Sequence, residues 1–166
     1  MTVPSYSRRR AEAHRAIEVP LHAAVELCRR GDWVRGLAEL IALADRFERS
    51  NLPALYYAYL GYGLAFREGR IADGLALCRH ALKLDFFLAD GYLQLARVHL
   101  LARERAIAVR AVRDGLRIEP THKGLNGLRI ELGIRRAPFL SFLGRTHPIN
   151  RALGRLRHRL FGSSGE

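Results

Sequence analysis

Apolar residues recur along the chain three or four positions apart, and no segment alternates apolar and polar residues with a period of two. A spacing of three and four places side chains on one face of an α-helix, whereas a period of two is typical of a strand. The pattern therefore predicts an all-α protein. The predicted helices cover residues 7–18, 20–30, 33–48, 53–67, 71–84, 88–102, 105–118, 122–134 and 148–161.

Turn-forming residues divide these helices into pairs. Gly31-Asp32, Gly69-Arg70 and Arg103-Glu104 each stand between two apolar-periodic segments, where the tight turn of a helix-turn-helix unit is expected. Pro20 and Pro53 stand where a helix is expected to begin, because the first turn of a helix does not need the backbone N–H that proline lacks. The sequence thus predicts consecutive helix pairs.

The pairs are related by a step of 34 residues. This step relates Asp85 to Glu119 and Leu82 to Leu116. Several matches at one fixed step indicate stacked structural repeats. The expected units cover about 17–50, 52–86 and 89–120, and a helix at 122–134 is expected to cap the last of them. The second unit has one or two residues more than a strict period.

The unit at residues 89–120 resembles the tetratricopeptide repeat. The matching positions are Tyr92, Leu95-Ala96, His99, the small residues Ala108 and Gly115, and Pro120. The resemblance implies a short right-handed superhelical solenoid of about three helix-turn-helix repeats, with a concave groove that holds a peptide or a partner helix. Small residues are expected where helices touch, because larger side chains would force the backbones apart. These are Gly61, Gly74, Ala81, Ala96, Ala108 and Gly115.

The resemblance also implies which residues face the groove. They are Leu21, Val25 and Arg29 in the first unit, Tyr59, Tyr62 and Phe66 in the second, and Asp90, Leu93, Arg97, Leu100 and Leu101 in the third. Some co-chaperones of this family hold a terminal carboxylate with Lys and Asn residues, but here only Gln94 and Arg97 stand near two of those places. An apolar and aromatic groove with one arginine suits an amphipathic helix or an extended peptide, with a preference for acidic partners.

Composition limits the class of protein further. The chain has 166 residues and 49% hydrophobic content, enough for one compact or solenoid domain. Cys28 and Cys78 lie far apart on predicted helices, so we expect two reduced, buried thiols in a reducing compartment. No apolar run follows the basic N-terminus, and the longest uncharged stretch, residues 52–66, is too short to span a membrane. A cytoplasmic protein is expected.

The net charge of +12 is concentrated near the C-terminus, where residues 133–166 hold seven arginines and one acid, Glu166. The predicted helix at 148–161 combines an apolar stripe with flanking arginines. The stripe is Ile149, Leu153, Leu156 and Leu160, and the arginines are Arg151, Arg155, Arg157 and Arg159. Four interpretations stay open: this helix packs on the repeats, binds another protein, contacts RNA or acidic lipid, or packs into the groove of a second copy.

The sequence contains no recognisable catalytic or metal-ligating set. The seven histidines are scattered singly, and His99, at an aromatic position of the repeat, is expected to be buried and structural. Asp85 and Asp90 flank a helix start, where capping accounts for an acid. We expect a non-catalytic adaptor that binds another protein, without metal or cofactor. The alternative is an RNA- or ribosome-associated protein that binds through its arginine-rich tail. The expected organisation is a basic extension (1–16), a repeat domain (17–134) and a basic segment (135–166).

Overall fold

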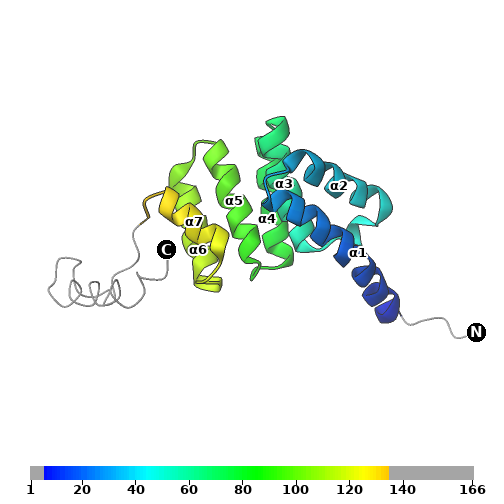
Figure 1. Cartoon of the computed structure of the whole chain (residues 1–166). Coiled ribbons are helices and arrows are strands. Elements are labelled where there is room, and N and C mark those ends of the chain that lie inside the picture. The colour runs from blue at the N-terminus through cyan, green and yellow to red at the C-terminus, as the bar shows by residue number, and fades with distance from the viewer. Residues whose placement is uncertain (1–5, 135–166) are drawn as a thin grey trace, which may run out of the picture. The chain divides into compact units, whose positions relative to one another are not determined.

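The computed structural model describes residues 6–134, with side chains from residue 16 onward. Seven α-helices and one short 3-10 helix, η1, form this part of the chain (Figure 1). They are α1 (Tyr6–Arg29), α2 (Trp33–Arg46), η1 (Arg49–Asn51), α3 (Ala54–Glu68), α4 (Ile71–Leu84), α5 (Ala89–Leu101), α6 (Arg105–Ile118) and α7 (Lys123–Glu131). The predicted all-α class is confirmed for this part of the chain. The chain divides into two compact units, Met1–Leu132 and Gly133–Glu166.

Within the first unit the helices pack as consecutive pairs, α1 with α2, α3 with α4, and α5 with α6. Each pair also packs on the next, through α2 with α3 and α4 with α5, and the leading helices α3, α5 and α7 contact one another in turn. Figure 1 shows the pairs following one another in chain order. This arrangement is compatible with an all-α repeat solenoid, in which each unit buries its apolar face against its neighbour.

The helix bounds follow the predicted period. The starts of α4 and α6 are 34 residues apart, and those of α3 and α5 are 35 apart, so the second unit carries one extra residue. The predicted bounds of helices α2 to α7 agree with the structure to within three residues at each end, while η1 was not predicted. The helix predicted at 148–161 lies outside the described residues.

The turn inside each pair has the same backbone conformation. Gly31, Gly69 and Arg103 have φ values of 90°, 70° and 61°, and the second helix of the pair begins two residues later in each case. Glycine adopts this left-handed conformation without steric cost, because it has no Cβ. The three turns predicted from the sequence are therefore confirmed, and in the third an arginine occupies the place that glycine holds in the other two.

The predicted helix break before Pro20 is wrong. Helix α1 runs without interruption from Tyr6 to Arg29, with Pro20 in its interior. Proline removes one hydrogen bond of the helix, but packing on both sides of it can hold the helix together. Ile17 and Leu21 on either side of the proline are 1% and 2% exposed and belong to the same core cluster. Burial of this apolar stripe outweighs the local signal of the proline.

The small residues lie where the helices approach most closely, as predicted. A Cβ on Gly61 would lie 2.8 Å from the Gly74 carbonyl oxygen, and one on Gly74 would lie 2.6 Å from the Gly61 carbonyl oxygen. Ala81, Ala96 and Ala108 are fully buried. Among the described helices, none is long and apolar enough to cross a membrane.

Candidate functional site

Three aromatic side chains gather where the start of α2 meets the C-terminal half of α3. The ring of Trp33 lies edge-on to Tyr62 and Phe66, with centroids 4.7 Å and 6.3 Å away, and the rings of Tyr62 and Phe66 stack 5.5 Å apart. Trp33 is 9% exposed, whereas Phe66 is 47% exposed. The group is therefore anchored in the core at Trp33 and open to solvent at Phe66. Aromatic groups of this kind present a large apolar area in a fixed orientation.

Arg97 on α5 extends this group across to the next helix pair. Its guanidinium carbon lies 5.5 Å from the centroid of the Tyr62 ring, and Nη1 donates a hydrogen bond to Gln94 Oε1 at 3.4 Å. No ion pair joins Arg97 to a carboxylate within the described part of the chain. The guanidinium group can therefore still form a bidentate contact with an incoming carboxylate. We refer to Trp33, Tyr62, Phe66 and Arg97 as the aromatic cluster.

The last turn of α5 adds aliphatic side chains to this region. Leu101 is the last residue of α5, one helical turn beyond Arg97, and is 39% exposed. Leu100 beside it is half-buried. Because α3 and α5 pack against each other, the exposed parts of Phe66 and Leu101 belong to neighbouring leading helices. This region can accept an apolar side chain and, at Arg97, a carboxylate.

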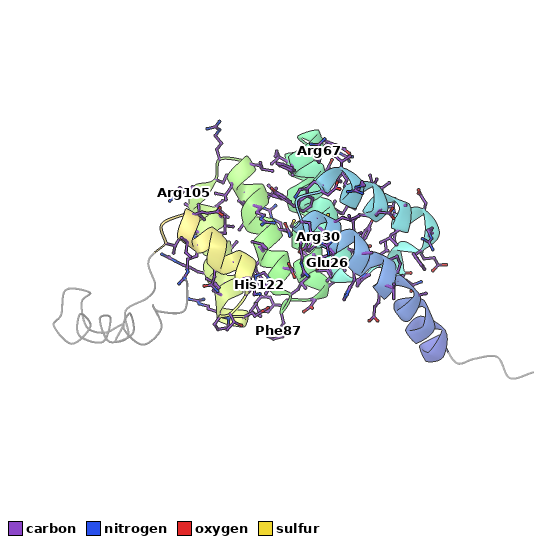
Figure 2. The ribbon with its side chains drawn as sticks, viewed as in Figure 1. Glu26, Arg30, Arg67, Phe87, Arg105 and His122 are labelled. Atoms are coloured by element: carbon purple, nitrogen blue, oxygen red, sulfur yellow. The ribbon has the colours of Figure 1, made fainter. Side chains whose placement is uncertain are left out.

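A second group of polar side chains connects the leading helices near their other ends. Tyr59 Oη donates to Asp90 Oδ1 at 2.8 Å, and Arg29 donates from Nε to Tyr59 Oη at 3.0 Å and from Nη2 to Asp90 Oδ2 at 2.9 Å. His122, the N-cap residue of α7, has its Nε2 atom 3.7 Å from Asp90 Oδ1 (Figure 2). We refer to Arg29, Tyr59, Asp90 and His122 as the polar clasp.

The electrostatics of the polar clasp are those of a structural contact. Burial raises the pKa of Asp90, but hydrogen bonds from His122 and Tyr59 and the charge of Arg29 outweigh it and hold that pKa below its usual value. Burial and the neighbouring Asp90 raise the pKa of Tyr59 well above its usual value. At neutral pH the clasp therefore contains a carboxylate, a protonated phenol and a guanidinium ion whose charges are already paired.

The hydrogen of His122 is also fixed by its neighbours. Its Nδ1 atom accepts a hydrogen bond from the backbone N–H of Leu125 at 3.1 Å, which caps α7. A neutral imidazole that accepts at Nδ1 carries its hydrogen on Nε2, so this hydrogen faces Asp90. His122 therefore joins the start of α7 to α5 and has no free nitrogen for metal binding in this arrangement.

The predicted groove residues divide into distinct sets. Tyr62, Phe66 and Arg97 come together in the aromatic cluster, with Leu101 close by along α5. Tyr59 and Asp90 meet in the polar clasp instead, and Tyr59 is only 1% exposed. The groove set is thus separated into an open apolar part and a closed polar part.

Three further predicted groove residues are core residues, and here the structure differs from the expectation. Leu93 is 4% exposed, because α7 packs closely over it: a Cβ on Gly124 would lie 2.6 Å from Leu93 Cδ2. Leu21 and Val25 are each 2% exposed in the core shared by α1, α2 and α3. None of these side chains is available at an open surface.

Sequence reasoning did not connect Arg29 and His122 to Asp90, nor Trp33 to Phe66. The one sequence signal for the clasp is its spacing: polar residues recur on successive leading helices at intervals of 30 to 32 residues, close to the repeat step. The contact between Trp33 and Phe66 has no comparable signal, because the two side chains meet across a helix pair boundary.

Other chemistry-bearing groups have structural roles. His99 is 2% exposed, with Nδ1 2.6 Å from Glu104 Oε2, as expected for a buried structural residue. Cys28 and Cys78 are buried free thiols, and burial raises their pKa to about 11 and about 12, so both stay protonated near neutral pH. No group of three or more His, Cys, Asp or Glu residues within the described part of the chain is arranged to hold a metal ion.

The basic surfaces give a mixed result. On α6, Arg105 donates to the Leu132 carbonyl oxygen at 2.6 Å and Arg117 pairs with Asp114 at 3.4 Å, while Arg110 and Arg113 are exposed. The predicted residues of the C-terminal basic helix lie outside the described residues. They are Ile149, Arg151, Leu153, Arg155, Leu156, Arg157, Arg159 and Leu160.

No protein-family model matches the chain, and no curated protein matches it with significant similarity. The tetratricopeptide resemblance therefore stays a prediction based on the residues named above.

Proposed function

We propose that this chain is a tetratricopeptide-like adaptor, without catalytic activity of its own, that binds an apolar segment of another protein at the aromatic cluster. The observation that carries the proposal is the combination of Phe66 and Leu101, which are 47% and 39% exposed, with Arg97, for which the described residues provide no carboxylate. Aromatic residues and arginine contribute more binding energy in protein interfaces than other residue types do.

The chemistry of this region defines the partner that it fits. An amphipathic helix or an extended peptide would place an apolar side chain against Phe66 and Leu101 and an acidic side chain against Arg97. Stacking on Tyr62 holds Arg97 in place, and packing on Trp33 holds Tyr62. Little conformational entropy is then lost on binding, which favours affinity. The proposed setting is cytoplasmic, and the two buried free thiols support it.

The repeat assignment is part of the proposal, and two observations support it. The helix pairs recur at steps of 34 and 35 residues, and the turn inside each pair contains one residue with positive φ. In addition, Gly115 contacts the next unit: a Cβ there would lie 2.7 Å from Leu125 Cδ1. These features agree with the small-residue positions that the resemblance identifies.

Capture of partners by the full-length chain from a native lysate, with matched variants, tests the proposal. Phe66→Asp and Arg97→Glu should each weaken capture of the same partner at least tenfold, which corresponds to about 1.4 kcal/mol or more. The control is Val34→Asp, since Val34 is 61% exposed and lies outside the cluster. Circular dichroism should show the same helical content in all variants. Capture that is unchanged in both Phe66→Asp and Arg97→Glu would refute the proposed site.

The same experiment separates the proposal from binding to RNA through the arginine-rich tail. Binding to phosphates weakens steeply as salt rises, because counterions are released. Capture through an apolar contact should be much less sensitive to salt and should survive nuclease treatment. Loss of all captured material after nuclease treatment would favour the RNA-associated alternative.

A further inference from the structure

The turn between α4 and α5 exposes large apolar side chains that the aromatic cluster does not use. Leu84, Phe86 and Phe87 are 53%, 63% and 75% exposed. Figure 2 shows Phe87 at the edge of the repeat unit, beyond the ends of the helices that flank it. Exposed apolar side chains scattered singly are common in proteins, whereas a contiguous group of them marks an interaction surface. We refer to Leu84, Phe86 and Phe87 as the phenylalanine edge.

The backbone of this turn is held in a defined conformation. The Phe87 N–H donates to Asp85 Oδ1 at 2.9 Å, and the Leu88 N–H donates to the Asp85 carbonyl oxygen at 3.4 Å. The Phe86 ring lies edge-on to Phe87 at 5.6 Å and to Tyr92 at 6.0 Å. Phe86 therefore supports Phe87 from behind, and Phe87 projects outward. A side chain fixed in this way loses little freedom when it is buried by a partner.

An apolar pocket of about 410 Å³ lies directly beside the phenylalanine edge. Its walls come from two inter-pair connections, the one that leads from η1 into α3 and the one between α4 and α5. The apolar lining residues are Leu52, Pro53, Ala54, Leu55, Leu84 and Leu88. Leu84 thus belongs both to the pocket and to the exposed edge, so the projection and the pocket form one continuous surface.

We propose that this surface binds a second copy of the chain, with Phe87 of each copy inserted into the pocket of the other. A two-fold symmetric interface requires that one surface patch carry both halves of the contact. The phenylalanine edge and its pocket satisfy this requirement, because one turn supplies the projection and the same turn supplies a wall of the pocket. A different partner would need only one of the two features.

The net charge of the chain affects the strength of this association. Two chains of charge +12 repel each other, and salt screens that repulsion. Association through the phenylalanine edge should therefore strengthen as salt rises, the opposite of binding to nucleic acid. The proposal is independent of the proposed adaptor function, since the phenylalanine edge lies before the start of α5 and the aromatic cluster lies near the C-terminal ends of α3 and α5.

Sedimentation velocity of the full-length chain over a range of concentrations tests the proposal. We expect a concentration-dependent shift from monomer to dimer in the wild-type chain. Phe87→Lys removes the projection and Ala54→Trp fills the pocket, so each variant alone should stay monomeric. Val34→Lys is the matched control, since Val34 is 61% exposed and lies outside this surface, and it should dimerise like the wild type.

Mixing the two monomeric variants gives a sharper test. Phe87→Lys keeps an open pocket and Ala54→Trp keeps its phenylalanine, so a mixed dimer retains one of the two contacts, and partial dimerisation should return. Phe87 lies in an exposed turn, so Phe87→Lys stays informative if Ala54→Trp fails to fold. A wild-type chain that is monomeric at every concentration overturns the proposal, even if the same edge binds lipid vesicles or another protein. Undiminished dimerisation of Phe87→Lys overturns it as well.

Discussion

Arg103 adopts a backbone conformation that its side chain disfavours. Its φ of 61° matches the values of Gly31 and Gly69 at the equivalent turns. For a residue with a Cβ, this left-handed conformation costs about 1 kcal/mol, since the Cβ comes too close to the following carbonyl oxygen. Two hydrogen bonds hold the turn: Arg103 N–H donates to the Leu100 carbonyl oxygen at 3.0 Å and Glu104 N–H to that of His99 at 2.8 Å. The fold overrides the preference of the residue.

Replacing Arg103 with glycine should therefore stabilise the protein. We expect the free energy of unfolding to rise by about 0.5–1 kcal/mol, because the relief of backbone strain exceeds the entropy that glycine adds to the unfolded chain. Urea denaturation followed by circular dichroism measures the change. The reverse control, Gly69→Ala, should lower the free energy of unfolding, since Gly69 has a φ of 70°. A loss of stability in Arg103→Gly would contradict this explanation.

At the residue scale, the sequence predicted what local patterns determine. The turn at Arg103 and the buried role of His99 followed from spacing alone. Leu93 and Arg97 lie four residues apart on α5, so periodicity placed them on one face, but packing of α7 covers Leu93 and leaves Arg97 partly open. A single helix pattern does not contain this difference, because it depends on how close the next helix comes.

At the element scale, the closest helix contact in a predicted pair depends on the absence of two side chains. Gly61 on α3 and Gly74 on α4 face each other, and a Cβ on either would meet the carbonyl oxygen of the other within 3 Å. Backbone atoms cannot move aside as the end of a flexible side chain can. The pair therefore requires glycine at both positions for a reason of packing and not of backbone conformation.

Two substitutions to alanine should have opposite effects. Gly61→Ala should lower the free energy of unfolding by about 1–3 kcal/mol, because the new methyl group separates α3 from α4. Gly127 lies in α7 with no atom within 4 Å of the position its Cβ would take. Gly127→Ala should raise the free energy of unfolding by about 1 kcal/mol through helix propensity. Urea denaturation of both variants measures the contrast, and a stabilising Gly61→Ala would refute the packing argument.

The bounds of most helices were predictable because capping, turn residues and apolar periodicity agree there. Helix α1 is the exception, since Pro20 gives a local signal for a helix start while Ile17 and Leu21 pack on both sides of it. Local signals describe the preference of an isolated segment, whereas burial of a continuous stripe decides the outcome in the folded chain. The sequence alone contains both tendencies and does not show which one is stronger.

At the scale of the whole repeat unit, the polar clasp connects parts of the chain that are not neighbours. In a simple solenoid each repeat contacts only the adjacent ones, and stability is a sum of neighbour terms. Here Arg29 on α1 pairs with Asp90 on α5 across 61 residues, from the first helix pair to the third. This contact should couple the unfolding of the pairs. It was not predictable from the repeat pattern, which describes relations between adjacent units only.

The clasp should also make the stability of the whole unit sensitive to acid. The pKa of Asp90 in the folded state lies below its usual value, which is about 3.9 in an unfolded chain. A lowered folded-state pKa means that the ionised carboxylate stabilises the fold above about pH 4, and that this contribution is lost as the pH falls below the unfolded-state value and through the folded-state value.

Asp90→Asn tests this dependence because it removes the charge and keeps the shape of the side chain. At pH 7 the variant should unfold with about 1–2 kcal/mol less free energy than the wild type, since Arg29 and Tyr59 lose a charged partner. The difference should shrink as the pH is lowered below about 4, where the wild-type carboxylate becomes protonated. Urea denaturation at a series of pH values measures both trends. Asp114→Asn is the control, since Asp114 forms an exposed pair with Arg117, and such pairs contribute little. If Asp90→Asn and Asp114→Asn behave alike at every pH, the clasp does not hold the helix pairs together.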